Sequence, residues 1–175
     1  MRSVYTIGYG GRSIIEFIGI LKLYGVEAVI DVRRWNKALK QPEFSGMNLQ
    51  VELSKNNIQY YWFPALGGFR KFGVDVEDIG IATCFKSNGF RAYATYITRC
   101  TEVKHYLEKL VELATYHLIA IMCCEKYPWF CHRKILSDYL VAKGFKVLHI
   151  IDREQVIEHV LSECAIIENN ELKYR

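Results

Sequence analysis

Short, nearly continuous apolar runs alternate with segments of helical spacing along most of the chain. Apolar runs of about four to eight residues are typical of strands covered on both faces. Five such runs lie at 3–7, 27–32, 58–63, 118–123 and 145–151. Helical spacing predicts helices over 14–24, 48–55, 90–116 (with room for a break near Thr101), 131–143 and 152–163.

This alternation predicts an α/β fold in three layers, with a mainly parallel sheet of about five strands and helices on both faces. The length suits a single domain over residues 1–175. Residues from about 70 to 89 have no clean period, so we expect an irregular insertion there, of the kind that often serves as a functional lid. A short C-terminal tail follows from about 165 to 175.

Composition narrows the class of protein without identifying it. Hydrophobic residues make up 51% of the chain and charged residues 24%, which permits a sizeable core and excludes a disordered chain. The net charge of +4 is compatible with an anionic partner but is far below that of a dedicated nucleic-acid binder. The 12 Tyr, nine Phe and three Trp residues are either core residues or stacking platforms for bases and sugars.

Nothing in the sequence predicts export or membrane insertion. The chain opens directly into a strand-like segment rather than a signal peptide, and no apolar run reaches the roughly 18 residues of a membrane span. We therefore expect a cytoplasmic protein without membrane association, in which the six cysteines are mostly reduced, a disulfide being left open as an alternative. We expect no cofactor, and the oligomeric state is left open.

The chemically distinctive residues gather where the predicted strands end. In open α/β sheets, ligands bind outside the carboxyl ends of the strands. The strand-end residues are Gly8, Tyr9 and Gly10 for the first strand, Asp31 and Arg33 for the second, Gly67 and Gly68 for the third, Cys124 and Glu125 for the fourth, and His149 and Asp152 for the fifth. This convergence predicts a site at that edge of the sheet.

Asp31 and Arg33 lie two residues apart on a strand, so their side chains point to the same face. They form either a salt bridge at the sheet edge or an anion-binding arginine held by a carboxylate, and Asp31 is also a candidate general base. The glycine turn at residues 8–10 is either a tight turn or a set of backbone N–H donors for an anion. His149 is either a hydrogen-bonded core residue or a general acid or base.

The stretch 118–133 is the centre of the predicted site: a buried strand, a turn and the start of a helix. Cys124 faces a helix N-terminus with His132 and Arg133 near, so it is either a nucleophile with a lowered pKa or a small buried thiol. A cation at a helix N-terminus opposes the helix dipole. We therefore expect Arg133 to bind a ligand anion or the carboxylate of Glu125 or Asp31.

The same stretch offers zinc ligands as an alternative. Cys124, Cys131 and His132, together with Glu125, carry the thiolate, imidazole and carboxylate groups that suit this metal. However, the sequence lacks a paired C-x-x-C motif, and we expect the adjacent Cys131 and His132 side chains to point in different directions on a helix. We therefore predict no metal site.

Several motifs together resemble the prokaryotic domain-of-unknown-function family 488. They are YTIGYGGRSIIEF, IDVRR, PALGG, GFRAYATYI, MCCEKYPWFCHRKIL and VLHI, in order from about residue 3 to 151. The resemblance implies an α/β domain with a shared polar site. The motif positions are Gly8, Tyr9, Gly10, Arg12, Ser13, Asp31, Arg33, Gly67, Gly68, Tyr93, Cys124, Glu125, Pro128, Cys131, His132, Arg133 and His149.

The prediction is an enzyme acting on a phosphate-bearing substrate, a nucleotide or nucleic acid, in a cleft at the carboxyl ends of the strands. The candidate catalytic residues are Asp31, Cys124, Glu125 and His149. The candidate substrate-binding residues are Gly8, Tyr9, Gly10, Arg33, Tyr93, Cys131, His132 and Arg133. The alternative is a non-catalytic nucleotide- or nucleic-acid-binding module, in which the same arginines and aromatic residues hold the ligand.

Overall fold

The computed structural model describes all 175 residues and has a six-stranded sheet in the order β3-β2-β4-β1-β5-β6. Strands β1 to β5 are parallel, and β6 is an antiparallel edge strand. The strands are β1 Ser3–Gly8, β2 Ala28–Asp31, β3 Gln59–Trp62, β4 Ile119–Cys123, β5 Lys146–Ile150 and β6 Val156–Glu158. The predicted α/β class and mainly parallel sheet are confirmed.

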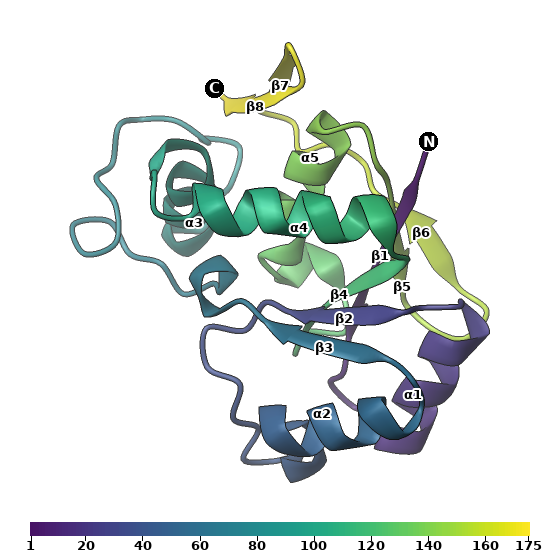
Figure 1. Cartoon of the computed structure of the whole chain (residues 1–175). Helices are drawn as coiled ribbons and strands as arrows, with labels where there is room; N and C mark the ends of the chain where they lie inside the picture. The colour runs from purple at the N-terminus through teal and green to yellow at the C-terminus, as the bar shows by residue number, and fades with distance from the viewer.

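Helices cover both faces of the sheet (Figure 1). Helices α1 (Ile14–Leu23) and α2 (Gly46–Lys55) pack on one face. Helices α3 (Asn88–Arg99), α4 (Lys104–Tyr116) and α5 (Arg133–Ala142) pack on the other. The sheet therefore separates two hydrophobic cores, the larger of which lies under α3, α4 and α5.

Local signals set the helix boundaries. Ser13 caps α1, because its hydroxyl accepts from the Glu16 N–H at 3.0 Å, whereas the Glu16 carboxylate pairs with Arg12 rather than completing a capping box. The break expected near Thr101 divides α3 from α4. Each of the three prolines begins a 3₁₀ helix, where its fixed φ is already suitable. These helices are Pro42–Phe44, Pro64–Leu66 and Pro128–Phe130.

The strand order creates a topological switch point between β1 and β4. The chain leaves β1 through α1 on one face and leaves β4 through α5 on the other, although the two strands are hydrogen-bonded neighbours. Loops that diverge in this way leave a crevice at the carboxyl ends of adjacent strands, the usual ligand position in open α/β sheets. The stretches following Gly8 and Cys123 therefore meet where a site is expected.

The predicted helix over 152–163 is wrong. Asp152 and Gln155 exchange backbone hydrogen bonds in a tight turn, and β6 then pairs with β5 through Leu148–Glu158, His149–Ile157 and Ile150–Val156. The helical signal came from a local capping pattern. Pairing wins because β5 would otherwise present a row of unsatisfied backbone groups at the edge of the sheet.

The C-terminal tail forms a hairpin of β7 (Ala165–Glu168) and β8 (Glu171–Tyr174), which packs near α3 and α5. A disulfide joins Cys84, in the irregular segment before α3, to Cys164 just before the hairpin. The other four cysteines are free, so the alternative of a disulfide applies to this one pair. No helix combines the length and the apolar character that crossing a membrane requires.

Candidate functional site

The ends of β1 and β4 are in close backbone contact. The Tyr9 N–H donates to the Cys123 carbonyl at 3.1 Å, and the Gly10 N–H donates to the Cys124 carbonyl at 2.8 Å. A Cβ atom on Gly8 would lie 1.8 Å from the Glu125 carbonyl oxygen, so only glycine permits this crossing. Two amides of the glycine turn therefore bind backbone carbonyls, which leaves the Tyr9 side chain as the turn's principal contribution to a site.

Strand alternation divides the predicted residues between the two faces of the sheet. Tyr9, Asp31 and Cys124 have the strand parity of the residues under α1 and α2. Thr6, Cys123 and His149 have the opposite parity, toward α5. We define the Arg33 cluster as Tyr9, Asp31, Arg33, Tyr60 and Cys124, and the Arg133 cluster as Thr6, Cys123, Cys131, His132 and Arg133.

In the Arg33 cluster, a fork-shaped pair forms between arginine and aspartate. Arg33 Nε donates to Asp31 Oδ1 at 2.9 Å and Nη2 to Oδ2 at 2.7 Å, while Tyr60 donates to Oδ2 at 2.5 Å. Burial alone lowers the pKa of Arg33, but the bonds and charge of Asp31 outweigh it and raise that pKa. Asp31 is fully buried and engaged by three donor groups, so it orients Arg33.

One nitrogen of Arg33 is left over. Nη2 also donates to the Phe44 carbonyl at 2.8 Å, but the buried Nη1 has no hydrogen-bond partner. The guanidinium carbon lies 5.1 Å from the centroid of the Tyr9 ring. Since Arg33 is only 6% exposed, Nη1 is a charged donor that lies away from water and has no acceptor within the protein.

Tyr9 links Arg33 to the exposed Cys124 thiol. Burial and the neighbouring Cys124 raise the pKa of the Tyr9 hydroxyl to about 12, so it is a neutral hydrogen-bond donor at physiological pH. Tyr9 stacks on Phe44, with centroids 4.6 Å apart. The Cys124 side chain reaches solvent, in contrast to the small buried thiol that was its alternative. A charged donor, a phenol and an accessible thiol therefore adjoin on one side of the switch point.

On the opposite face, Arg133 is fully buried and has no carboxylate within reach. Its Nη1 donates to the Thr6 hydroxyl at 3.0 Å, its Nε to Cys131 Sγ at 3.4 Å, and its Nη2 to the main-chain carbonyl of Glu125. The Glu125 carboxylate itself is exposed, and Asp31 lies on the other face. Neither of the carboxylates expected to pair with Arg133 does so, although Glu125 remains accessible to a ligand.

Cys131 lies in surroundings that favour a thiolate. Burial opposes its ionisation, but a hydrogen bond from the Cys123 thiol and the charges of His132 and Arg133 lower the pKa of Cys131 well below that of an ordinary thiol. The pKa of Cys123 is raised in turn by the same pairing and by burial. Sequence reasoning assigned Cys131 a role in substrate binding, so the lowered pKa of its buried thiol was not predicted.

His132 is held by two neighbours. Its Nε2 lies 2.8 Å from the Val32 carbonyl, and the edge of the Tyr93 ring packs against it with centroids 5.0 Å apart. Tyr93 is itself buried, and its hydroxyl donates to the Leu66 carbonyl at 2.7 Å. A Cβ atom on Gly68 would lie 2.9 Å from His132 Nδ1, so Gly68 allows the close approach of this ring. Tyr93 and Gly68 therefore support the histidine.

His149 belongs to a buried relay, which we define as His149, His159, Asp138 and Tyr174. Its Nδ1 lies 2.7 Å from the Thr6 hydroxyl and its Nε2 2.9 Å from His159 Nδ1. His159 Nε2 lies 2.8 Å from Asp138, to which Tyr174 also donates at 2.7 Å. Burial and nearby positive charge lower the pKa of His149 to about 3. The neutral His149 ring therefore connects the Thr6 hydroxyl to Asp138 through His159.

Sequence reasoning missed Thr6, Asp138, His159 and Tyr174. Asp138 and Ser137 are fully buried polar residues in a predicted amphipathic helix, and their adjacency was a usable signal of a polar contact. His159 was placed in a helix that does not exist, which concealed its pairing with His149. Thr6 gave no signal, because threonine is common in strands.

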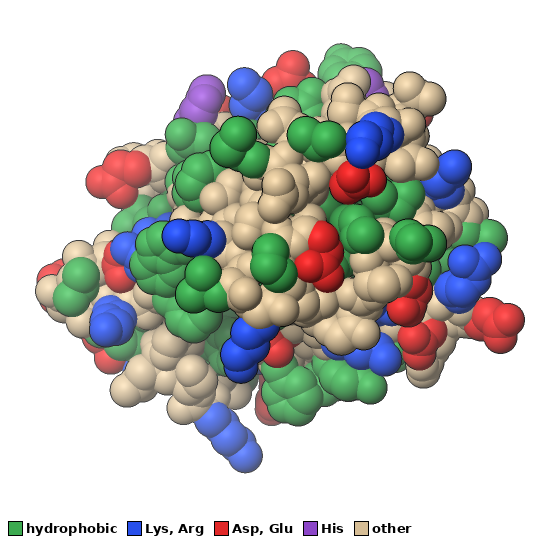
Figure 2. Space-filling model, turned by 90° about the horizontal axis from the view of Figure 1, so that it is seen from below, with side chains coloured by type: hydrophobic (Ala, Val, Ile, Leu, Met, Phe, Trp, Pro, Cys, Tyr) green, Lys and Arg blue, Asp and Glu red, His purple; other side chains and the backbone are tan.

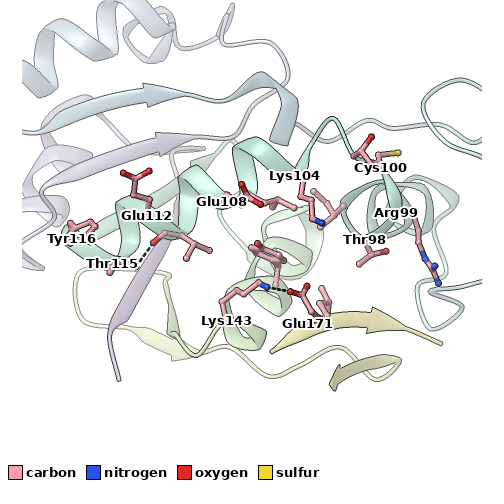
Figure 3. Close-up of a pocket in the computed structure, with 16 residues that line it drawn as sticks. Thr98, Arg99, Cys100, Lys104, Glu108, Glu112, Thr115, Tyr116, Lys143 and Glu171 are labelled. Carbon is pink, nitrogen blue, oxygen red and sulfur yellow. Dashed lines mark hydrogen bonds and ion pairs between the residues drawn. The ribbon is translucent and has the colours of Figure 1, made fainter. Parts of the chain in front are cut away.

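A separate cavity of about 580 Å³ opens between α3, α4, the end of α5 and β8 (Figure 3). The Lys143–Glu171 ion pair, 2.7 Å long, crosses it, and Lys104, Glu108 and Tyr139 also line it. None of the predicted site residues lines this cavity. No residue of the Arg33 cluster or the Arg133 cluster lines it either.

A comparison with protein-family models shows which family the chain belongs to. The model described as Domain of unknown function DUF488 matches residues 13–140, most of the chain. The chain belongs to the DUF488 family. Searches among curated proteins and among solved structures found no match. The resemblance noted from the motifs is thereby confirmed. The matched range includes Arg33 and Arg133, whereas β1 precedes it and the relay residues after Leu140 follow it.

Proposed function

We propose that the protein is an enzyme that acts on a phosphate-bearing substrate, a nucleotide or nucleic acid, bound beside Arg33 at the carboxyl edge of the sheet. One observation carries this proposal: Arg33 is 94% buried and charged, yet its Nη1 has no hydrogen-bond partner. A phosphate oxygen accepts such a donor, and the Asp31 fork presets its direction.

Cys124 is the candidate nucleophile of this proposal, because its thiol is exposed and adjoins the Tyr9 hydroxyl. Asp31 acts as a positioning residue, because its oxygens are occupied by Arg33 and Tyr60. Glu125, with an exposed carboxylate one residue after Cys124, is the candidate general base. His149 and Arg133 support the fold on the other face of the sheet.

Exposed aromatic side chains favour a base-containing substrate. They lie at the end of β3 and in the segments that follow β2, β3 and β4, and one pair, Tyr127–Trp129, is stacked with centroids 5.0 Å apart. Bases stack on such rings with little sequence preference. The exposed rings in these places are Trp35, Trp62, Phe69, Tyr127, Trp129 and Phe130.

The distribution of surface charge favours a site for one or two phosphate groups over an extended basic surface that follows a nucleic-acid backbone. In Figure 2, which views the molecule from below Figure 1, basic and acidic side chains are interspersed and hydrophobic groups lie between them. The net charge is only +4. A long polyanion held by backbone neutralisation alone requires a continuous basic stripe. Recognition of one or two phosphate groups by Arg33 requires none.

The test is calorimetric binding at low salt, with nucleoside mono- and triphosphates and a short single-stranded DNA as probes. The wild type should bind at least one probe, and Arg33→Lys should weaken binding about 10- to 100-fold by removing the fork geometry. Arg2→Lys, at an exposed arginine, is the matched control and should bind as the wild type does. Absence of binding to every probe, or equal binding by Arg33→Lys, contradicts the proposal.

Turnover separates the enzyme from a non-catalytic module, which the exposed aromatic residues also favour. Products of the bound probe are followed by mass spectrometry in the wild type and in Cys124→Ser, with Cys100→Ser as the control thiol. Loss of turnover with retained binding in Cys124→Ser supports the nucleophile. Binding that is sensitive to Arg33→Lys, without turnover in any form, establishes the module instead.

A further inference from the structure

Three soft ligand atoms meet in the Arg133 cluster. Cys123 Sγ, Cys131 Sγ and His132 Nδ1 all lie within 4.8 Å of one another. Cys123 ends β4, and the other two residues directly precede α5, so the group joins two elements on either side of the turn. All three residues are buried, the most exposed being Cys123 at 8%. Buried thiols and an imidazole at this spacing are the usual ligands of zinc-class ions.

In the neutral form that binds metals, His132 presents the lone pair of Nδ1 to the sulfur of Cys131. Nε2 lies 2.8 Å from the Val32 carbonyl, and a carbonyl only accepts, so Nε2 carries the hydrogen. In the neutral ring, Nδ1 is then unprotonated, and it lies 3.7 Å from Cys131 Sγ. A second hydrogen bond of this kind is how proteins orient metal-binding imidazoles. Cys131 and His132 thus converge, contrary to the expectation that they point apart.

The charges in the cluster also suit a divalent ion. Arg133 Nε already donates to Cys131 Sγ at 3.4 Å, which stabilises the thiolate form that a metal needs. An ion of charge +2 bound by two thiolates carries no net charge. Since Arg133 already favours the thiolate of Cys131, binding releases the proton of Cys123, and the neutral metal site places no repelling charge beside Arg133.

We propose that Cys123, Cys131 and His132 bind one zinc-class divalent ion, with water or an exogenous ligand at a fourth position. With metal–sulfur bonds of about 2.3 Å and metal–nitrogen bonds of about 2.0 Å, a tetrahedral ion separates sulfur from nitrogen by about 3.5 Å. The observed 3.7 Å between Cys131 Sγ and His132 Nδ1 requires little adjustment. Three protein ligands with one open position is the pattern of a catalytic rather than a structural zinc.

The test is a Co²⁺ titration of the full chain after removal of metals with a chelator, followed by competition with Zn²⁺. One equivalent of Co²⁺ should produce a sulfur-to-cobalt charge-transfer band together with the visible bands of a tetrahedral ion, and Zn²⁺ should abolish both. Cys123→Ser, Cys131→Ser and His132→Gln should each weaken Co²⁺ binding more than about 100-fold, since loss of second-sphere groups alone costs 10- to 100-fold.

Matched variants keep the result interpretable. Cys124→Ser and Cys100→Ser remove the other two free thiols, which lie outside the cluster, and should leave the bands and the stoichiometry unchanged. Gly68→Ala, which crowds His132 Nδ1, should weaken binding without removing a ligand. Circular dichroism verifies that each variant is folded. Absence of the charge-transfer band in the wild type, or its persistence in folded Cys131→Ser, overturns the proposal, and neither outcome affects anion binding at Arg33.

Discussion

Arg33 and Arg133 are buried arginines at the carboxyl edge of the same sheet, on opposite faces, and their charges are balanced differently. Arg33 holds Asp31 in a two-bond fork and leaves Nη1 free. Arg133 uses all three nitrogens on neutral oxygens and a sulfur, without contact to a carboxylate. One side of the sheet therefore carries a neutral pair with a spare donor, and the other a cation that favours anionic sulfur.

The difference shows that the immediate contacts of a buried charge determine which further interactions it can make. A guanidinium paired with a carboxylate can bind a further anion only through an unused nitrogen. A guanidinium without a carboxylate lowers the pKa of a nearby thiol. The same residue type thus has a spare donor nitrogen under α1 and α2, and favours a thiolate under α5.

The largest expected effect comes from Arg133→Met. Three contacts from separate elements are lost, and a buried thiolate is left without its cation, so the free energy of unfolding should fall by about 5 kcal/mol. Urea unfolding measures the change, and Arg99→Met, at an exposed position, should alter it by no more than about 0.5 kcal/mol. A loss below about 1 kcal/mol for Arg133→Met would mean that the cluster does not depend on this charge.

The disulfide lies on the same face of the sheet as Arg133. The disulfide between Cys84 and Cys164 closes a loop with a sequence separation of 80. Replacing both cysteines by serine should lower the free energy of unfolding by about 4 kcal/mol, because the unfolded chain regains the entropy of that loop. Thermal unfolding with and without reductant measures this, with Cys100→Ser as the control. If reductant leaves the wild-type Tm unchanged, the tie adds no stability.

For the Arg33 cluster we expect Asp31→Asn to cost about 3 kcal/mol, because it leaves a buried guanidinium uncompensated. The matched control is Asp78→Asn, since Asp78 forms an exposed pair with Arg91 and should contribute about 1 kcal/mol or less. The double variant Arg33→Met with Asp31→Leu should lose less than Asp31→Asn alone. If the double variant is less stable than Asp31→Asn, the cost of Asp31→Asn does not come from an uncompensated Arg33 charge.

The smallest effect, at about 1.4 kcal/mol for each pH unit, is a pH dependence that belongs to the relay. The pKa of His149 is about 3 in the folded state and 6.5 in the unfolded chain. Between these values only the unfolded state binds the proton, so stability falls as the pH drops below 6.5, by up to about 1.4 kcal/mol per pH unit. Chemical unfolding between pH 4 and 7 should show this slope in the wild type and in His105→Gln, at an exposed histidine, but a reduced slope in His149→Gln.

Much of the fold follows from local patterns. Continuous apolar runs located β1 to β5, and Ser13 marked the start of α1. Local patterns failed at β6, because the need to cover the β5 edge arises only in the assembled sheet. The residues predicted for the site lie at the carboxyl edge of the sheet because alternating strands and helices make the strands parallel, so that their carboxyl ends meet at one edge.

The sequence alone determined the α/β fold, the family, and the fact that Asp31 and Arg33 share a face, because a strand repeats every two residues. Only the tertiary structure decided which cysteine lies in the Arg33 cluster and which cysteines lie in the Arg133 cluster. Adjacent strand residues point to opposite faces, so Cys123 meets Cys131 while Cys124 meets Tyr9. The bond that joins Thr6 to His149 of the relay connects residues with a sequence separation of 143. Such contacts exist only after the helices have packed on the sheet.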